Sequence, residues 1–575
     1  MTNSSQLFIE ALRSATPRGR VLTSPQATLR YRSGIKVGGG DACAVVQPAS
    51  LLEFWQSLKV CTEFNKIVIC QAANTGLTGG STPDGNEYDR DVVIISNIKL
   101  DKLTLLNGGA QVLAWAGSSL YRLEDILRPI GRGPHSVIGS SCIGASVVGG
   151  ICNNSGGNLV NRGPAYTELS LFAQLDSEGE LSLVNHLNIN LGDSPEDILT
   201  NLQDGNFEAN QTDPSPGVAS DNEYQRRVRE IDKSTPARFN ADKRRLHESS
   251  GCAGKLAVFA VIVDTFNKPT TEKVFYIGTN KPSQLSHLRK RILTEFDELP
   301  EMGEYMHRSY FDGADKYCKD SFLFIKYLGS AFLPKLFAIK SWVDGTMNKL
   351  SFIPKSFSDR TLQRLARIWP DHLPKRMREY RNRYEHHLMI VANDEVIEST
   401  RALLSEELGA DGTSESGKKD KGDYFECTDS EGLAAQIHRF VAGGASGRYA
   451  IVHDEECGGL MPFDIALPRN CDDWHCLLPP DVLDQLAAPY SLGHFFCQVI
   501  HWDFVVKEGV EIEPLKARIL AILDEHGAKY PAEHNVGHLY EAEPDLANFY
   551  QSLDPTNSFN SGVGKMSKLK NYKAA

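Results

Sequence analysis

The chain has 575 residues, more than one hydrophobic core normally holds, so two or three domains are expected. Its 41% hydrophobic and 23% charged residues are typical of a globular protein, and its net charge of −12 excludes general binding to polyanions unless a basic patch is present. The twelve cysteines contain no C-x-x-C pair, which argues against a zinc ribbon and against a secreted disulfide scaffold.

The first 270 residues alternate between predicted helices and strands. Ser50 with Glu53 three residues later is typical of a helix start. Short β-branched runs predict buried strands, and leucines at helical spacing before Gly131 predict a helix that ends there. In chain order we expect a helix from residue 51, strands over 66–70, 91–96 and 111–117, a helix over 120–130 and a strand over 254–266.

Two glycine-rich segments carry the chemistry, QAANTGLTGGSTPDG at 71–85 and VIGSSCIGASVVGGICNNSGGN at 137–158. Glycine lets the main chain turn sharply and approach a ligand, and successive amides in such turns can bind phosphate oxygens. Either segment alone could equally serve tight turns. Together, with interleaved serines and threonines, they favour a diphosphate such as that of FAD. Neither matches a Rossmann or P-loop motif.

These segments, together with ESSGCAGKLAVFAV, EYMHR, YEHHL, PAEHNVGHLY and DPTNSFNSGVGK, resemble the respiratory quinone-dependent D-lactate dehydrogenases of bacteria. That family belongs to the FAD-linked oxidases, which include vanillyl-alcohol oxidase. The resemblance covers nearly the whole chain. It implies an α+β protein with a two-subdomain FAD-binding domain of the PCMH type and an α/β cap domain.

The resemblance also implies the domain limits. The FAD-binding domain would span residues 1–264, the cap 265–515 and a C-terminal return to the FAD-binding domain 516–575. A basic membrane-binding insertion is expected within the cap at about 307–383. Bound without a covalent link, FAD would contact a set of residues from both glycine segments and the strand after them. They are Ala72, Ala73, Asn74, Thr75, Gly76, Gly80, Ser81, Gly139, Ser146, Gly156 and Val258.

A histidine and carboxylate cluster is expected near the substrate. His494 and His501 lie seven residues apart, and Glu533 is followed by His534. In related 2-hydroxy-acid dehydrogenases, histidines with this spacing and a Glu-His dipeptide line the substrate pocket and hold a divalent metal. Here Phe-Phe-Cys-Gln-Val replaces the Gly-Asp-Gly-Asn between the histidines, so the presence of a metal is unknown. The two histidines could equally be buried, hydrogen-bonded residues of a core strand.

The implied reaction is oxidation of D-lactate to pyruvate, with electrons passed to a membrane quinone. His534 is the candidate base, because the pKa of histidine lies near working pH. Arg448 is a possible partner of the substrate carboxylate, since arginine presents a fork of donors.

Residues 326–383 contain 13 Lys or Arg against 4 Asp or Glu, a local charge of +9, with aromatic residues interleaved. Composition alone would also allow a solvated basic face. With the resemblance, it favours attachment to an anionic membrane surface that high salt weakens. Nucleic acid is not an expected partner, because no recognised binding module accompanies the patch. The first twenty residues lack the apolar core of a signal peptide, so we expect a peripheral protein on the cytoplasmic face of the bacterial inner membrane.

Two other functions fit parts of the sequence. One is a soluble flavin oxidase or dehydrogenase of another 2-hydroxy acid, such as D-2-hydroxyglutarate. The other is a membrane- or nucleic-acid-binding protein that has kept the fold and lost the cofactor, because fold alone does not establish function. Bleaching of a yellow protein by D-lactate without oxygen would separate these from the main hypothesis.

Overall fold

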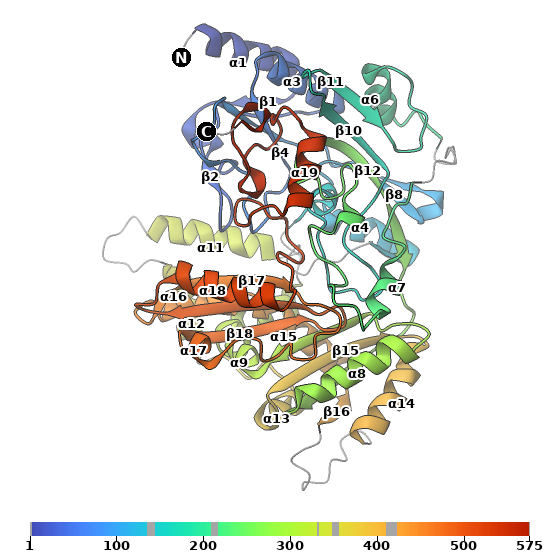
Figure 1. Cartoon of the computed structure of the whole chain (residues 1–575), viewed down its shortest axis with the longest axis vertical. Helices are drawn as coiled ribbons and strands as arrows, with labels where there is room; N and C mark the ends of the chain where they lie inside the picture. The colour runs from blue at the N-terminus through green and yellow to red at the C-terminus, as the bar shows by residue number, and fades with distance from the viewer. Residues whose placement is uncertain are drawn as a thin grey trace.

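The computed structural model describes residues 3–134, 144–208, 217–329, 333–347, 356–409 and 422–573. Figure 1 shows two bodies, one above the other, and the last part of the chain joins them. The upper body holds two large sheets built from the N-terminal half, and the lower body holds one large sheet.

The first sheet has the strand order β1-β3-β6-β4. β3, β6 and β4 run parallel, and β1 is antiparallel to β3. Their bounds are β1 Arg20–Leu22, β3 Ala44–Gln47, β4 Ile67–Gln71 and β6 Val92–Ser96, and helices α1 Asn3–Ala15 and α3 Leu51–Glu63 share their core. The predicted helix start is confirmed, because the Ser50 side chain accepts a hydrogen bond from the Glu53 amide.

The second sheet is antiparallel, in the order β11-β10-β12-β8-β7, with β9 paired to the far end of β12. Its strands are β7 Leu103–Leu106, β8 Gln111–Trp115, β9 Arg132–Pro134, β10 Ser170–Leu175, β11 Leu181–Asn185 and β12 Ala257–Asn267. The helices of this part are α4 Leu120–Leu127, α5 Val147–Cys152, α6 Pro195–Asp204 and α7 Tyr224–Arg229. The strands and helices expected up to residue 266 are thus confirmed to within a few residues.

The third sheet has seven antiparallel strands in the order β16-β13-β15-β14-β18-β19-β17. They are β13 Glu272–Thr279, β14 Met302–His307, β15 His386–Asn393, β16 Asp423–Glu426, β17 Cys457–Ala466, β18 Leu486–His494 and β19 Val499–Lys507. One face packs on α8 Pro282–Glu295, α14 Val396–Leu408 and α18 Ile512–Glu525. The other packs on α9 Arg308–Tyr317, α10 Lys319–Leu328, α13 Lys375–Arg383, α15 Asp429–Ala442 and α16 Ala445–Val452. The sheet therefore lies between two helix layers, which buries both faces.

Two further helices, α11 Leu333–Met347 and α12 Phe357–Leu365, belong to the segment predicted to be basic. After α18 the chain returns to the upper body (Figure 1). There Val68 of β4 exchanges backbone hydrogen bonds with Ser558 and Asn560, at 2.8 and 2.9 Å. Helix α19, Pro544–Leu553, packs beside this return. The C-terminal residues thus complete the body in which the glycine-rich segments lie.

Candidate active site

A cavity lies between the two glycine-rich segments. Nine of the eleven residues expected to contact FAD line it, namely Ala72, Ala73, Asn74, Thr75, Gly76, Gly80, Ser81, Ser146 and Val258. Gly139 falls outside the described residues. Gly156 is not among the lining residues and packs against Glu533, which lies within 3 Å of where a side chain at this position would begin.

The local structure explains why these residue types occur here. The first segment follows β4 and bends at Asn74, whose positive φ of 54° is an arrangement that asparagine tolerates. The second segment enters α5, where the Ser146 hydroxyl accepts a hydrogen bond from the Gly149 amide at 3.0 Å and caps the helix. Both turns thus bring main chain to the cavity wall.

The cavity wall carries little charge. The described lining residues include no Lys, Arg, Asp or Glu, and His534 and Asn535 are among them. Asn97 is 3% exposed and its Oδ1 has no hydrogen-bond partner among the described residues. A cavity with apolar walls, hydroxyl groups and main-chain amides suits a dinucleotide whose phosphates are bound by backbone dipoles. The residues present therefore fit FAD.

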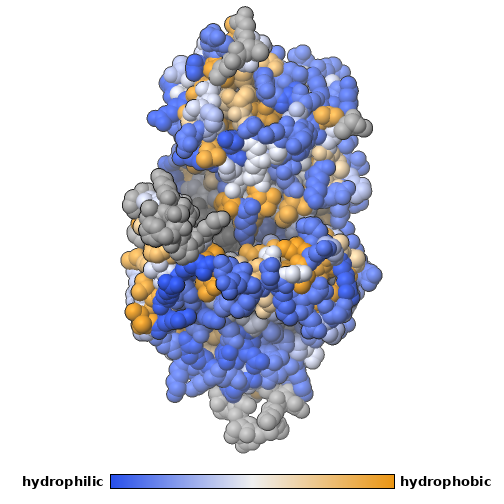
Figure 2. Space-filling view, turned by 90° about the vertical axis from the view of Figure 1, so that its left-hand side faces the viewer, coloured by the Kyte–Doolittle hydropathy of each residue, from blue (hydrophilic) through white to orange (hydrophobic). Residues whose placement is uncertain are grey.

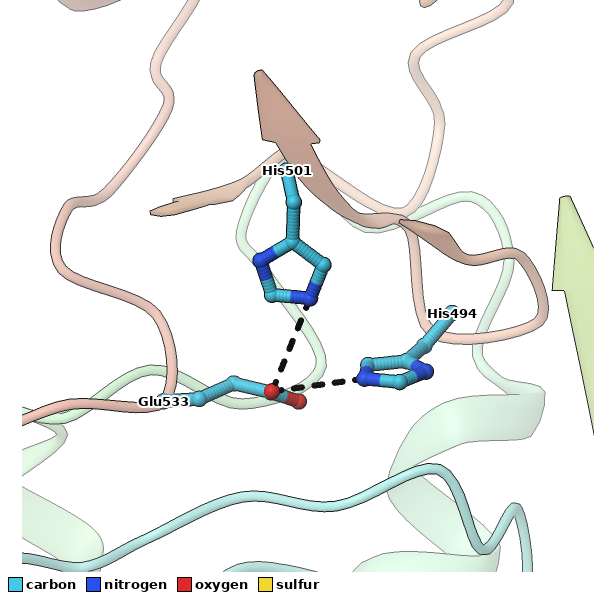
Figure 3. Close-up of side chains that lie close together, drawn as sticks. All are labelled: His494, His501 and Glu533. Atoms are coloured by element: carbon cyan, nitrogen blue, oxygen red, sulfur yellow. Dashed lines mark ion pairs between the residues drawn. The ribbon is translucent and has the colours of Figure 1, made fainter. Parts of the chain in front are cut away.

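A second feature is the cluster of His494, His501 and Glu533 (Figure 3). His494 ends β18, His501 lies in the neighbouring strand β19, and Glu533 comes from the return after α18. Both Nε2 atoms face the same Glu533 oxygen, Oε2, at 3.3 Å from His494 and 3.7 Å from His501. The structure thus brings together three predicted residues that are far apart in sequence.

Each histidine has a carboxylate behind it. Glu304 Oε1 lies 2.7 Å from His494 Nδ1, and Asp464 Oδ1 lies 3.4 Å from His501 Nδ1. Glu304 faces His494 because their strands pair at these residues, and the same holds for Asp464 and His501. A carboxylate on one ring nitrogen fixes the tautomer and aims the other nitrogen, as is usual for metal-binding histidines.

Sequence reasoning missed Glu304, Asp464 and Arg238, which bonds to Glu533. Glu304 lies in the EYMHR segment that carried part of the resemblance, which was the one available signal. Asp464 and Arg238 belong to no recognised sequence motif. Their roles depend on strand register and on a segment that crosses between the bodies.

The cluster could hold a metal ion. The ligand atoms of His494, His501 and Glu533 all lie within 4.8 Å of one another, and among the described residues they are the one group of His, Cys, Asp or Glu of this kind. Two imidazoles and a carboxylate suit zinc and similar divalent ions. Binding would first require loss of any proton on the Nε2 atoms.

The charges around His494 hold it in the protonated form when no metal is bound. Burial disfavours the cation, but Glu304 and Glu533 outweigh it and raise the pKa of His494 to about 10. In the same way, His494 and Arg238 overcome burial and hold the pKa of Glu533 well below its usual range. At neutral pH neither group is therefore suited to act as a base.

His534 links the two features. It is one of the residues that line the cavity, and its Nε2 is 4.0 Å from Asp464 Oδ2. The same Asp464 oxygen accepts hydrogen bonds from the backbone amides of Glu533 and His534, at 2.7 and 3.2 Å. One buried carboxylate therefore positions the Glu-His dipeptide and faces two imidazoles.

Arg448 is not brought to this cluster. It lies in α16, 9% exposed, with ion pairs to Asp320 at 2.9 Å and to Asp359 at 2.7 Å. Asp320 belongs to α10 and Asp359 to α12. The structure places this arginine beneath the basic segment of the lower body.

The basic segment carries less uncompensated charge than its sequence indicates. At least seven of its thirteen basic residues form ion pairs with acidic ones, among them Arg376, Arg378 and Arg381. Exposed basic and apolar side chains alternate here, namely Lys326, Tyr327, Leu328, Arg364, Leu365, Arg367 and Ile368. Figure 2 shows hydrophobic side chains gathered at an edge of the lower body on this side of the molecule. No helix in the described part of the chain is both long and apolar enough to cross a membrane.

Comparison with known proteins agrees with this geometry. The family model described as "D-lactate dehydrogenase, membrane binding" matches residues 274–572. The quinone-dependent D-lactate dehydrogenase of Escherichia coli K12 is 51% identical over 572 residues, which cover 99% of this chain and 98% of that protein. Those of Haemophilus influenzae and Corynebacterium glutamicum are 51% and 43% identical, each over 99% of both chains.

The chain belongs to the quinone-dependent D-lactate dehydrogenase family. The resemblance noted in the sequence is thereby confirmed. A family member is expected to need both an oxidation site and a surface for the membrane, and the cavity and the basic segment lie in different bodies of this chain.

Solved structures with low sequence identity to this chain show the same fold. p-Cresol methylhydroxylase with substrate bound has a TM-score of 0.56 at 11% identity and covers 99% of this chain and 98% of its own. Alkyldihydroxyacetonephosphate synthase has the same TM-score and identity and covers 97% of this chain and 84% of its own. The α+β fold with a PCMH-type domain and a cap is therefore confirmed.

Proposed function

We propose that this protein uses non-covalent FAD to oxidise D-lactate to pyruvate and passes the electrons to a membrane quinone. The observation that carries the proposal is the adjacency of two features. A cavity between two glycine segments is lined in part by His534, and His534 lies beside a His-His-Glu cluster through their common partner Asp464. Membership of the family supplies the substrate and the acceptor.

We propose that residues 1–264 and 516–575 form the cofactor domain and that 265–515 form the cap. Gly139 and the nine lining residues named above would contact FAD. When bound, FAD supplies the two-electron acceptor for the substrate and the donor for the quinone.

The side chains of the protein would bind the substrate carboxylate and accept the hydroxyl proton. D-Lactate loses a hydride from Cα and a proton from its hydroxyl group, which leaves the carbonyl of pyruvate. His534 would accept that proton on its imidazole, and Asp464 would stabilise the resulting cation. His494, held as a cation, would attract the lactate carboxylate, and a divalent ion held by His494, His501 and Glu533 would bind the carboxylate and hydroxyl instead.

Membrane attachment would follow from the basic segment and place the protein at the cytoplasmic face, with anionic lipid as its partner and no nucleic acid. Quinones dissolve in the bilayer, so the electron donor must reach its surface. Exposed basic side chains contribute about 1 kcal/mol each near an anionic surface.

The deciding experiment uses the purified full chain. The protein should be yellow, and its flavin absorption should bleach when D-lactate is added without oxygen. D-2-Hydroxyglutarate and L-lactate serve as comparisons, and a short-chain quinone should restore the colour. Faster bleaching by D-2-hydroxyglutarate would favour the alternative 2-hydroxy-acid dehydrogenase. A colourless folded protein that added FAD does not reconstitute would refute the flavin assignment.

A further inference from the structure

Arg238 is a buried cation that no sequence motif marks. It follows α7 on the segment that leads toward β12, and it is 2% exposed. One nitrogen, Nη2, donates a hydrogen bond to the Gly157 carbonyl at 2.5 Å and another to Glu533 Oε1. The guanidinium also lies 6.0 Å from the centre of the Tyr224 ring. Arg238 thus connects the second glycine segment to the carboxylate of the His-His-Glu cluster.

Gly156 also lies against the Glu533 side chain. A Cβ at this position would lie 2.7 Å from Glu533 Cγ and 2.8 Å from Oε1, closer than such atoms ever approach. The Gly156 amide donates to the Glu533 carbonyl oxygen at 3.3 Å. Because glycine has no side chain, the space beside its Cα is occupied by the side chain of Glu533.

These contacts occupy one carboxylate oxygen of Glu533 and leave the other to interact with the two histidines. Oε1 is occupied by Arg238, whereas Oε2 faces the Nε2 atoms of His494 and His501. A planar guanidinium binds a carboxylate in a defined direction, and the ammonium group of lysine does not. Rotation of Glu533 by a small angle would move Oε2 away from both histidines.

We propose that Arg238 is a positioning residue for D-lactate oxidation that acts through Glu533, and that Gly156 provides the space for that carboxylate. This inference rests on the proposed function. It places Gly156 next to the His-His-Glu cluster of the proposed substrate site. The family resemblance had instead implied that Gly156 contacts FAD. It also makes the glycine segment and the histidine cluster parts of one connected unit.

A double-mutant cycle tests the proposal on the full-length enzyme with FAD. Arg238→Gln should lower kcat/KM for D-lactate by about 100-fold, as expected for a misplaced active-site group. In an enzyme that already carries Glu533→Gln, the same change should cost less than about threefold, because residues acting through one another are not additive. Equal losses in both backgrounds would refute action through Glu533.

Arg227→Gln is the matched control. Arg227 is 4% exposed, lies in the preceding helix α7 and pairs with Asp221, which is outside the cluster. Its effect on kcat/KM should be the same in both backgrounds. Should Arg238→Gln fail to fold, Arg238→Lys takes its place in the cycle; it keeps the charge, and we expect it to lower kcat/KM about tenfold when Glu533 is present.

Gly156→Ala provides an independent readout. It should bind FAD in full, measured by flavin absorbance per chain, while anaerobic reduction by D-lactate slows by about 100-fold. Loss of FAD from this variant would show a flavin contact and overturn the assignment of Gly156. If D-lactate does not bleach the wild-type enzyme, the proposed function itself is refuted. If the wild-type enzyme is active but the losses in kcat/KM are additive in the double-mutant cycle, only this inference is refuted.

Discussion

Asp464 is the residue on which the geometry of the proposed base depends. It is 7% exposed and accepts the backbone amides of Glu533 and His534, while its two oxygens face the rings of His501 and His534. Burial raises the pKa of such a carboxyl group, but the nearby His501 and His534 rings outweigh burial and lower it. A carboxylate held in the charged form beside an imidazole favours the protonated product of base catalysis.

Replacement of the proposed base should separate chemistry from cofactor binding. His534→Gln should lower the rate of anaerobic flavin reduction by D-lactate by about 10²- to 10⁴-fold, the usual contribution of a general base. Stopped-flow absorbance measures this rate, and the flavin content should stay within about twofold of wild type. His526→Gln, at an exposed position after α18, is the control. A wild-type rate in His534→Gln would show that another group accepts the proton from the D-lactate hydroxyl.

At the scale of elements, the loop that follows β4 forms part of the wall of the proposed FAD cavity. Gly76 lines the cavity and has no atom within 4 Å of where its Cβ would lie. The main chain here is exposed to the cavity, so an added side chain would occupy ligand space and would not disturb the packing.

Gly76→Leu should therefore fold and lose FAD. We expect flavin content below about a tenth of wild type, since each 1.4 kcal/mol lost from binding weakens it tenfold, and a melting curve like that of the wild-type apoprotein. Gly443→Leu is the control, because Gly443 also has open space at its Cβ position and ends α15 in the lower body. Full flavin content in Gly76→Leu would place the cofactor elsewhere.

Helices α10, α12 and α16 are joined by the ion pairs of Arg448. Removal of one partner from a buried ion pair leaves the other charges unpaired, which usually costs about 3–5 kcal/mol. Arg448→Met should lower the free energy of unfolding of the lower body by about this amount, measured by urea titration of its tryptophan fluorescence. An unchanged free energy of unfolding together with a large increase in KM for D-lactate would instead support the expectation that Arg448 binds the substrate carboxylate.

Across the whole molecule, buried histidines make the fold sensitive to acid. His387 and His438 both contact the Phe311 ring, each is 1% exposed, and burial lowers the pKa of each to about 3. In the unfolded chain these groups titrate near 6.5. Between pH 6.5 and 3 the unfolded state binds more protons, so stability is lost as the pH falls through this range.

The measurement is the free energy of unfolding in urea at pH 7.5 and pH 5.0. Each of the two histidines should contribute a loss of about 2 kcal/mol over this interval. His387→Phe, which fits beside the rings of Tyr276 and Phe311, should remove one such contribution. His526→Phe should leave the pH dependence as it is. Equal slopes for wild type and His387→Phe would contradict the assignment.

Membrane attachment is a second property of the whole molecule. Wild-type protein should sediment with phosphatidylglycerol vesicles at 50 mM salt and be released as ionic strength rises. The pair Arg364→Gln and Arg367→Gln should weaken binding by about 10- to 30-fold, from about 1 kcal/mol per basic residue. Arg226→Gln with Lys243→Gln removes two exposed charges outside the segment and serves as the control. Retention at 1 M salt would argue against electrostatic attachment.

The sequence by itself determined the class of the site. The glycine segments follow local rules of turn and helix-start geometry, and the family resemblance marked the cofactor contacts among them. Those that line the cavity in this part of the chain are Ala72, Ala73, Asn74, Thr75, Gly76, Gly80, Ser81 and Ser146. The spacing of His494 and His501 and the Glu-His dipeptide likewise marked three residues that the fold brings together.

Only the tertiary structure decided which groups surround those residues. Glu304 and His494 are 190 positions apart, and Arg238 and Glu533 are 295 apart, so strand register and the path of a crossing segment determine their contacts. The same reason explains Arg448, whose charged partners lie on helices that no sequence pattern could place beside it. Local conformation is encoded by neighbouring residues, whereas the charge around a buried group depends on side chains that meet only after the core has packed.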